Sequence, residues 1–331
     1  MEYRAPAWLP GGHLQTIWAA LQARRVAGPR PLWRRERWGT PDGDFVDVDW
    51  LRPDPSPPPA PGAPLLVLFH GLEGSSRSHY AEAFAGWARG QGWRFAVPHF
   101  RGCSGEPNLA PRAYHSGDFE EIGWMLGRFA ARQRDEGGGP LLAVGVSQGG
   151  NALMRWAAEA GAEAGSTVRA VASVCAPLDL TAAGHHIGRG FNRQVYTRMF
   201  LRSMKPKALA KLAQHPGLFD ARRLRAARDL FAFDDLFTAP LHGFAGVQDY
   251  WQRASAKPHL RAVRLPALLL NARNDPFVPA ASLPTAAEVS ASTTLWQPAE
   301  GGHVGFPQGA PPGRVFWLPR AVGGWLATQL A

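Results

Sequence analysis

Leu141-Leu142-Ala143-Val144-Gly145-Val146-Ser147-Gln148-Gly149-Gly150-Asn151 is the stretch that decides the fold expected for this chain. It begins as a short apolar run typical of a buried strand and continues into a pattern typical of a helix. The Gly-x-Ser-x-Gly between them predicts a sharp turn with Ser147 at its apex, its hydroxyl exposed at the carboxyl end of a sheet. Gly145 and Gly149 keep the crowded flanks free of side chains. A glycine-rich turn without chemistry is the alternative interpretation of this stretch alone.

The residues that follow favour the catalytic interpretation. A nucleophilic serine needs a histidine base and a carboxylate that orients the base. The next strong strand pattern, 266–272, leads to Asp275, and Pro276 disfavours the helical conformation there. His303 lies in a glycine-flanked loop between a strand pattern at 292–296 and a helix pattern at 315–330. The order serine, acid, histidine, each after a strand, predicts a triad of Ser147, Asp275 and His303.

One other acid competes with Asp275 for this role. Asp179 follows the strand pattern 170–175. Pro177 and Leu178 before it are typical of a turn that begins a helix, so we expect Asp179 to be a helix-starting residue.

Two backbone N–H groups must also stabilise the negative oxygen of a tetrahedral intermediate. One comes from the residue after the nucleophile, and the other from a loop after an earlier strand. The buried-strand pattern 65–69 runs into His70-Gly71-Leu72-Glu73-Gly74. We therefore predict an oxyanion hole made by the amides of Leu72 and Gln148. His70 is expected to brace the loop rather than to act as a base.

Six motifs are spread along nearly the whole chain: His13-Leu14-Gln15-Thr16, His70-Gly71-Leu72-Glu73-Gly74, Phe100-Arg101-Gly102-Cys103-Ser104, 145–151, Asn274-Asp275-Pro276-Phe277 and Gly302-His303-Val304-Gly305-Phe306. Together they resemble the motifs of the AB hydrolase superfamily, and within it the YheT-like branch. The resemblance implies an α/β-hydrolase fold and a serine esterase-like or lipase-like hydrolase that uses the Ser147/Asp275/His303 triad. The chain departs from the family pattern at Asn274, where a second aspartate is common, and at Asp249-Tyr250-Trp251, where a second tyrosine is usual.

The N-terminal motif has no mechanism that the sequence alone explains. We expect His13-Leu14-Gln15-Thr16 to brace the N-terminal segment.

The length of 331 residues suits a catalytic core with an insertion. Alternating strand and helix patterns predict a doubly wound, mostly parallel sheet built from residues 1–180 and 256–331. Residues 181–255, called the insertion below, have helical patterns and many arginines and aromatic residues, and are expected to form a helical cap. The aromatic residues of the insertion are expected to line an apolar acyl pocket: Phe191, Tyr196, Phe200, Phe231, Phe233, Phe237, Tyr250 and Trp251. The alternative is that these helices pack on the sheet edge, with the aromatic residues as their core. The proline-rich stretch 53–64 is expected to be an extended surface connector.

The formal net charge is +10, and lysine occurs only at positions 205, 207, 211 and 257. Runs such as 34–37 and 222–225 are able to attract phosphate, anionic lipid or acidic substrates. No zinc-finger, helix-turn-helix or aromatic RNA-binding signature accompanies the charge, so we expect no nucleic-acid partner. Four arginines of the insertion are expected either to surround the mouth of an acyl pocket and meet an anionic membrane surface or simply to solubilise the cap: Arg189, Arg193, Arg198 and Arg202.

The sequence thus predicts an enzyme that cleaves carboxylic esters, with a small-molecule or lipid ester as its substrate and without a metal or cofactor. A short-chain carboxylesterase and a monoacylglycerol-lipase-like enzyme both fit. An acyltransferase with the same acyl-enzyme and a non-catalytic ligand-binding hydrolase fold remain alternatives. Two cysteines, Cys103 and Cys175, make no disulfide framework. No apolar run long enough to span a bilayer is present, and we expect a soluble, cytoplasmic protein.

Overall fold

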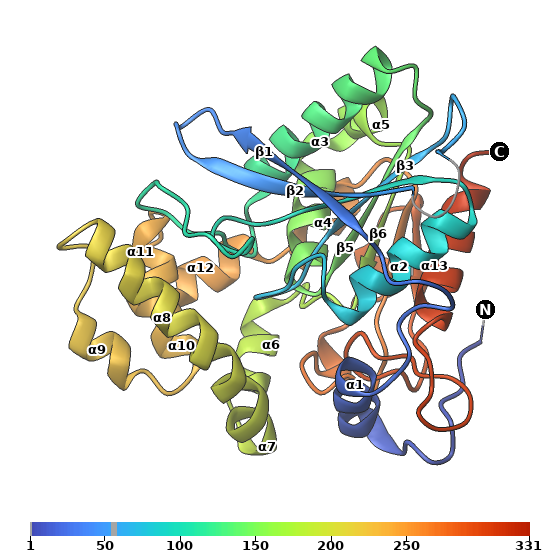
Figure 1. The fold of residues 1–331 in the computed structure, drawn as a ribbon. Coiled ribbons are helices and arrows are strands. Elements are labelled where there is room, and N and C mark those ends of the chain that lie inside the picture. The colour runs from blue at the N-terminus through green and yellow to red at the C-terminus, as the bar shows by residue number, and fades with distance from the viewer. Residues whose placement is uncertain (1, 54–57) are drawn as a thin grey trace.

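The computed structural model describes residues 2–53 and 58–331, and its centre is one eight-stranded sheet (Figure 1). The strands lie in the order β1-β2-β4-β3-β5-β6-β7-β8. Strands β4, β3, β5, β6, β7 and β8 are parallel neighbours, whereas β1 and β2 pair antiparallel at one edge. The strands are β1 (Trp33–Gly39), β2 (Phe45–Leu51), β3 (Leu65–Phe69), β4 (Arg94–Pro98), β5 (Leu141–Val146), β6 (Ala170–Val174), β7 (Ala267–Leu270) and β8 (Thr293–Trp296).

The central strands form because their residues are short, continuous apolar runs. Every residue of β3, β5, β6 and β7 is buried. Parallel strands covered on both faces need such runs, since neither face meets water. The predicted doubly wound, mostly parallel sheet is therefore confirmed. The predicted connector 53–64 includes residues 54–57, which lie outside the described residues.

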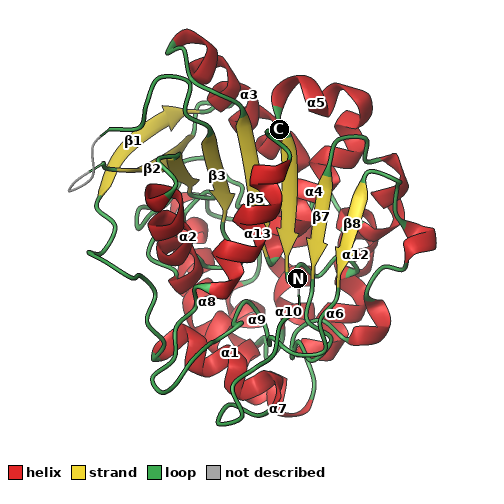
Figure 2. Cartoon of the chain, turned by 90° about the vertical axis from the view of Figure 1, so that its right-hand side faces the viewer, coloured by secondary structure: helices red, strands yellow, loops and turns green. Residues whose placement is uncertain are grey.

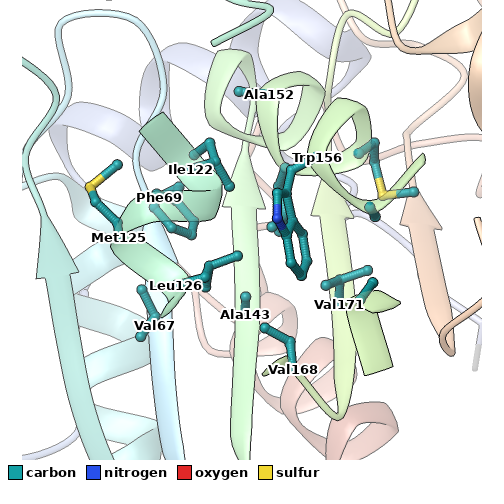
Figure 3. Packing of buried hydrophobic residues seen from close by; sticks show 14 of the residues in the cluster. Val67, Phe69, Ile122, Met125, Leu126, Ala143, Ala152, Trp156, Val168 and Val171 are labelled. Carbon is teal, nitrogen blue, oxygen red and sulfur yellow. The ribbon is translucent and has the colours of Figure 1, made fainter. Parts of the chain in front are cut away.

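Helices cover both faces of the sheet (Figure 2). Helices α3 (Phe119–Asp135) and α4 (Gln148–Ala160) pack on one face, where Ile122, Leu126 and Trp156 meet strand residues such as Val67 and Val171 (Figure 3). Helices α2 (His79–Gly90) and α13 (Trp317–Thr328) pack on the other face. The two apolar layers hold the strand ends in fixed positions, which a site built at those ends requires.

Between β6 and β7 the chain forms a group of helices that lies to one side of the sheet, at the left in Figure 1. Two apolar clusters of its own stabilise it, one around Trp251 and one around Phe233. The group comprises α6 (Leu180–Ile187), α7 (Gly190–Asn192), a π-helical turn (Arg193–Thr197), α8 (Arg198–Gln214), α9 (Ala221–Ala226), α10 (Leu230–Phe233), a second π-helical turn (Asp234–Thr238), α11 (Ala239–Leu241) and α12 (Val247–Ala254).

The remaining helical elements are short apart from the first. Helix α1 (Gly11–Leu21) lies near the C-terminal loops. No helix in the part of the chain that the structure describes is both long enough and apolar enough to cross a bilayer. The other short elements are α5 (Ala164–Thr167) and the 3-10 turns Gly161–Glu163, Lys257–Ala262, Ala280–Ser282 and Ala286–Glu288.

One basic run of the sequence is paired with acidic residues of the chain itself. Residues 34–37 lie on β1, where Arg35 pairs with Asp49 at 2.8 Å. Arg37 pairs with Asp47 at 2.8 Å and with Glu106 at 2.6 Å. Arg34 also pairs with Glu36 at 3.4 Å, so all three arginines of this run face carboxylates of the chain itself. Attraction of an external anion by this run stays a prediction.

Candidate active site

Ser147 lies at a sharp turn between β5 and α4. Its backbone has φ 52° and ψ −120°, a conformation that non-glycine residues rarely adopt and that marks functional sites. A Cβ at Gly145 would lie 2.4 Å from the Gly149 carbonyl oxygen, and one at Gly149 would lie 2.5 Å from the His70 carbonyl oxygen. Both glycines are required because main chains approach too closely there for a side chain. The predicted strand–turn–helix around Ser147 is present.

His303 lies between Ser147 and Asp275. Its Nε2 is 3.0 Å from Ser147 Oγ, and its Nδ1 is 2.8 Å from Asp275 Oδ2. Asp275 and His303 are 4% and 8% exposed. Because a carboxylate accepts from Nδ1–H, Nε2 is the nitrogen left to accept the serine proton, a tautomer assigned from this network. The structure thus brings together the three residues predicted for the triad.

Three further contacts support this arrangement. Asp275 Oδ1 accepts hydrogen bonds from the backbone N–H of Phe277 at 2.7 Å and of Val278 at 3.3 Å. The Phe277 ring stacks on the His303 imidazole with centroids 4.0 Å apart. Asp179, the competing acid, instead caps α6 by accepting from Ala182 N at 2.9 Å, as expected for a residue that begins a helix.

The loop after β3 lies against Ser147. A Cβ at Gly71 would be 3.0 Å from Ser147 Cβ, and Leu72 and Gln148 both line the cavity above the serine. His70 Nδ1 donates to the Gly71 carbonyl at 2.7 Å, while its Nε2 accepts from Phe100 N at 3.1 Å. Burial lowers the pKa of His70 to about 3, so the ring stays neutral. His70 therefore braces the loop as expected.

Glu73 completes this loop in the left-handed region, at φ 57°. Its N–H donates to Tyr114 Oη at 3.0 Å, and Tyr114 Oη–H donates back to the Glu73 carboxylate at 3.0 Å. The carboxylate also pairs with Lys207 of α8 at 2.9 Å. The same loop that carries Leu72 is thus connected to the insertion.

A cavity of about 510 Å³ opens from Ser147 and His303 into the insertion. Its size falls within the range of small-molecule sites, and its lining is mainly apolar. Five of the aromatic residues predicted for an acyl pocket line it: Phe200, Phe233, Phe237, Tyr250 and Trp251.

The other three of the eight aromatic residues predicted for the pocket do not line this cavity, so the prediction was wrong for them. Phe191 and Phe231 are 55% and 36% exposed. Tyr196 faces His13, whose Nδ1 is 3.0 Å from the tyrosine oxygen.

The arginines of the insertion lie elsewhere than expected. Arg193, Arg198 and Arg202 line a separate groove together with Lys205 and Arg228. Helix α8 divides the groove from the cavity, since Arg198, Arg202 and Lys205 face one side, and Phe200, Met204 and Lys207 the other. Arg189 lines neither space. The expectation that these arginines surround the mouth of the acyl pocket is therefore wrong.

One cluster has the residue types of a metal site. The ligand atoms of Cys175, Asp275 and His303 lie within 4.8 Å of one another. Burial, and then the charge of Asp275, raise the pKa of the Cys175 thiol well above its usual value, which keeps the proton on sulfur. Its Sγ accepts from Val304 N at 3.3 Å. A protonated thiol is a poor metal ligand, and this chemistry fits a hydrogen-bonded acid–histidine pair better.

The residues that sequence reasoning missed belong to α1. Gln15 Oε1 accepts from Asn274 Nδ2 and from Gly301 N, both at 2.9 Å. Thr16 Oγ1 accepts from His303 N at 2.8 Å. The motif 13–16 was the available signal, but its partners lie more than 250 residues away along the chain.

Comparison with known proteins agrees with this geometry. The family model described as alpha/beta hydrolase fold matches residues 64–310. Over 320 residues the chain is 40% identical to the Escherichia coli (strain K12) protein named "Putative esterase YheT", covering 96% of this chain and 91% of the relative. Over 325 residues it is 26% identical to "Phospholipase ABHD3" of Homo sapiens, covering 96% and 76%.

A solved structure, the Pyrococcus furiosus esterase Pf2001, is similar in fold with a TM-score of 0.52 and 14% identity, covering 94% of this chain and 98% of that one. The buried sheet, the turn at Ser147 and the family match together mean that this chain belongs to the α/β-hydrolase family, in the branch that includes YheT.

Proposed function

We propose that this protein is a serine hydrolase that cleaves carboxylic esters at Ser147. The observation that carries the proposal is the unbroken chain from Asp275 Oδ2 to His303 Nδ1 at 2.8 Å and from His303 Nε2 to Ser147 Oγ at 3.0 Å. It lies at the floor of an apolar cavity. The relatives named as an esterase and a phospholipase support ester chemistry.

In the first half of the reaction, Ser147 Oγ attacks the ester carbonyl carbon as His303 Nε2 takes the hydroxyl proton. Asp275 holds the imidazole tautomer and stabilises the imidazolium that forms. The carbonyl electron pair moves onto oxygen, where the amides of Leu72 and Gln148 stabilise it. Gln148 opens helix α4, so the helix N-terminus adds to this stabilisation.

In the second half, the intermediate collapses, the bond to the alcohol oxygen breaks, and His303 Nε2–H returns the proton to that oxygen. A water then attacks the acyl-enzyme while His303 again acts as the base. The second collapse releases the carboxylic acid and restores Ser147. No step requires a redox change, and every proton passes through His303.

The insertion supplies the acyl site in this proposal and acts as the cap of the core formed by residues 1–180 and 256–331. Ile187, Met204 and Phe233 provide apolar walls. A largely apolar lining favours an acyl chain over a charged substrate, because apolar surface leaves water on binding. This chemistry fits short-chain esters and monoacylglycerol-like lipids.

The groove lined by basic residues, called the cationic groove below, gives a reason to propose a lipid surface as a partner. Its cations are Arg193, Arg198, Arg202, Lys205 and Arg228. Within the described residues, the cations that line the groove form one ion pair, between Arg193 and Asp229 at 3.9 Å. Partial burial, and then the charge of Arg228, lower the pKa of Lys205, so the like charges are crowded. Met199, between groove residues 198 and 202 on the same helix, is 54% exposed. Cations beside exposed apolar side chains suit an anionic membrane surface.

The proposal is tested with purified protein and p-nitrophenyl esters of increasing acyl length. We expect turnover with the wild type, and a loss of at least about 10³-fold for Ser147→Ala, which removes the nucleophile and keeps the fold. Adding an alcohol acceptor separates hydrolysis from acyl transfer by the product formed. Equal activity of Ser147→Ala and wild type would refute the proposal, whereas ester formed in preference to acid would make the enzyme an acyltransferase.

A further inference from the structure

Helix α1 lies against the two loops that carry Asp275 and His303, although it is at the opposite end of the chain (Figure 1). The approach is close. A Cβ at Gly12 would lie 1.8 Å from the Asn274 carbonyl oxygen, and one at Gly305 would lie 2.3 Å from the Gln15 carbonyl oxygen. Main chain therefore touches main chain at both loops, and a small movement of α1 would displace both.

Three side chains connect helix α1, the loop of Asp275 and the loop of His303 with one another. Gln15 is fully buried. Its Oε1 accepts from Asn274 Nδ2 on the loop that carries Asp275, called the acid loop below, and from Gly301 N on the loop that carries His303, called the histidine loop below. Its amide nitrogen donates to the Leu9 carbonyl at 3.0 Å, which fixes the side-chain oxygen toward the loops. Asn274 Oδ1 accepts from Gly302 N at 2.9 Å, so the two loops are also joined directly.

Thr16 acts on the histidine itself. Its hydroxyl donates to the Gly12 carbonyl at 2.7 Å, which leaves the oxygen lone pairs for the backbone N–H of His303 at 2.8 Å. Replacing the hydroxyl by a methyl group leaves that N–H unpaired in a buried position, which is unfavourable. The hydroxyl therefore determines where the main chain of His303 lies.

The histidine loop needs such support because its backbone is strained. Val304 and Phe306, neither of them glycine, have φ of 56° and 45°. Left-handed conformations of this kind persist where surrounding contacts determine them. Relaxation of either residue would shift His303 away from the line between Asp275 and Ser147.

From these contacts we infer that Gln15, Thr16 and Asn274 are positioning residues for the triad, forming what we call the α1 clamp. The inference rests on the proposed function. The clamp touches neither the cavity nor the reacting atoms, so it acts through the placement of His303. A misplacement of about 1 Å costs about 100-fold in rate. Loss of the clamp should therefore lower kcat and leave KM nearly unchanged, because the acyl cavity is intact.

Thr16→Val is the sharpest variant, because it is nearly isosteric and removes only the hydroxyl. We expect kcat on a p-nitrophenyl ester to fall by about 10- to 100-fold, with KM within about twofold of the wild type. Thr16→Ser keeps the oxygen and should restore most of kcat. Thr328→Val removes an exposed hydroxyl of α13 that donates to Trp325 O and accepts from Gln329 Nε2, both within the same helix end, and serves as the matched control.

Hydrogen–deuterium exchange over residues 301–306 provides a readout that needs no catalysis. The clamp predicts faster exchange there in Thr16→Val than in wild type or Thr328→Val. If the wild type hydrolyses no ester, the proposed function fails while the exchange result still decides the clamp. Unchanged exchange in a folded Thr16→Val protein, or a kcat equal to that of the wild type, would overturn the inference, as would failure of Thr16→Ser to recover activity.

Discussion

The catalytic loops and the insertion are held to the molecule in different ways. Asp275 and His303 lie on loops that buried side chains of α1 connect through well-formed hydrogen bonds. The insertion has its own apolar clusters, separate from the two clusters that cover the sheet. Many of its polar links run to the irregular segment 105–118, as from Lys211 to the carbonyls of Asn108 and Ala110.

This difference separates two properties of the site. In the proposed mechanism the loops fix the proton path, in which a displacement of an ångström matters. In the same proposal the insertion supplies the acyl walls. It contacts the catalytic loops at few points, such as Asn192 Nδ2 with the Pro276 carbonyl at 2.6 Å and Lys207 with Glu73 at 2.9 Å, so a substitution elsewhere on its cavity wall should leave the proton path in place. Substitutions in the first region should therefore change kcat for every ester, and those in the second should change which ester is accepted.

The largest effect is expected for Asp275→Asn. An amide at this position favours the wrong histidine tautomer, in which Nε2 carries the proton and no longer accepts from Ser147. We expect kcat to fall by roughly 10³- to 10⁴-fold on short and long esters alike. Kinetics on acetate and octanoate p-nitrophenyl esters measure this. A loss confined to one chain length would contradict the separation.

Met204→Trp should give the opposite pattern. Met204 lines the cavity on α8, so a larger ring there shortens the acyl site. We expect kcat/KM for an octanoate ester to fall by about tenfold, while the acetate ester is nearly unaffected. Met199→Trp places the same ring on the exposed face of the same helix and is the control. Equal loss on both esters would mean that the insertion also shapes the proton path.

The fold of the core could be predicted because its signals are local. Buried strands such as β3 and β5 are continuous apolar runs, and the turn at Ser147 needs glycines at fixed positions. The order of Asp275 and His303 after two further strands indicated the other two residues of the candidate triad. The clamp could not be predicted, since nothing near Gln15 and Thr16 in the sequence names their partners. The predicted placement of the insertion's arginines around the cavity was wrong for a related reason. The sequence shows that α8 is basic, but it does not show which face of the helix meets the cavity.

A smaller effect concerns stability at low pH. Burial depresses the pKa of His70 to about 3 in the folded protein, below the usual 6.5. Between these two pH values the unfolded chain therefore binds more protons than the folded protein. Protonation of His70 in the unfolded chain lowers the free energy of unfolding there, so the full stability is present above pH 6.5 and is lost progressively as pH falls toward 3. Denaturant titrations should show the free energy of unfolding decreasing over this range, and less steeply in His70→Gln. His186→Gln, at an exposed site of the insertion, should leave the slope unchanged. An equally steep slope in His70→Gln would refute the assignment to His70.

The effect with the least consequence for catalysis is expected in the cationic groove. Arg198→Gln with Arg202→Gln should weaken binding to vesicles containing anionic lipid by about 10- to 30-fold, since each cation near such a surface contributes about 1 kcal/mol. Binding of the wild type should also fall as salt rises from about 0.1 to 0.5 M. Hydrolysis of a soluble neutral ester should be unchanged. Arg134→Gln with Arg320→Gln, on α3 and α13 away from the insertion, removes the same charge as a control (Figure 1).

Three results would refute the proposal that the cationic groove binds an anionic membrane surface. They are equal loss of vesicle binding in the control, equal binding to neutral and anionic vesicles, and no binding by the wild type. Salt-sensitive binding of RNA or an acidic protein in place of vesicles would assign the groove to a different partner.

The most direct test of the central claim is covalent labelling of the nucleophile. A fluorophosphonate reacts with an activated serine, so intact-mass measurement should show one adduct on the wild type, and peptide mapping should place it on Ser147. Ser147→Ala should remain unlabelled, and His303→Ala should react at least about 10³-fold more slowly because the base is missing. An adduct on another residue, or a wild type that stays unlabelled while properly folded, would contradict the Ser147–His303–Asp275 mechanism.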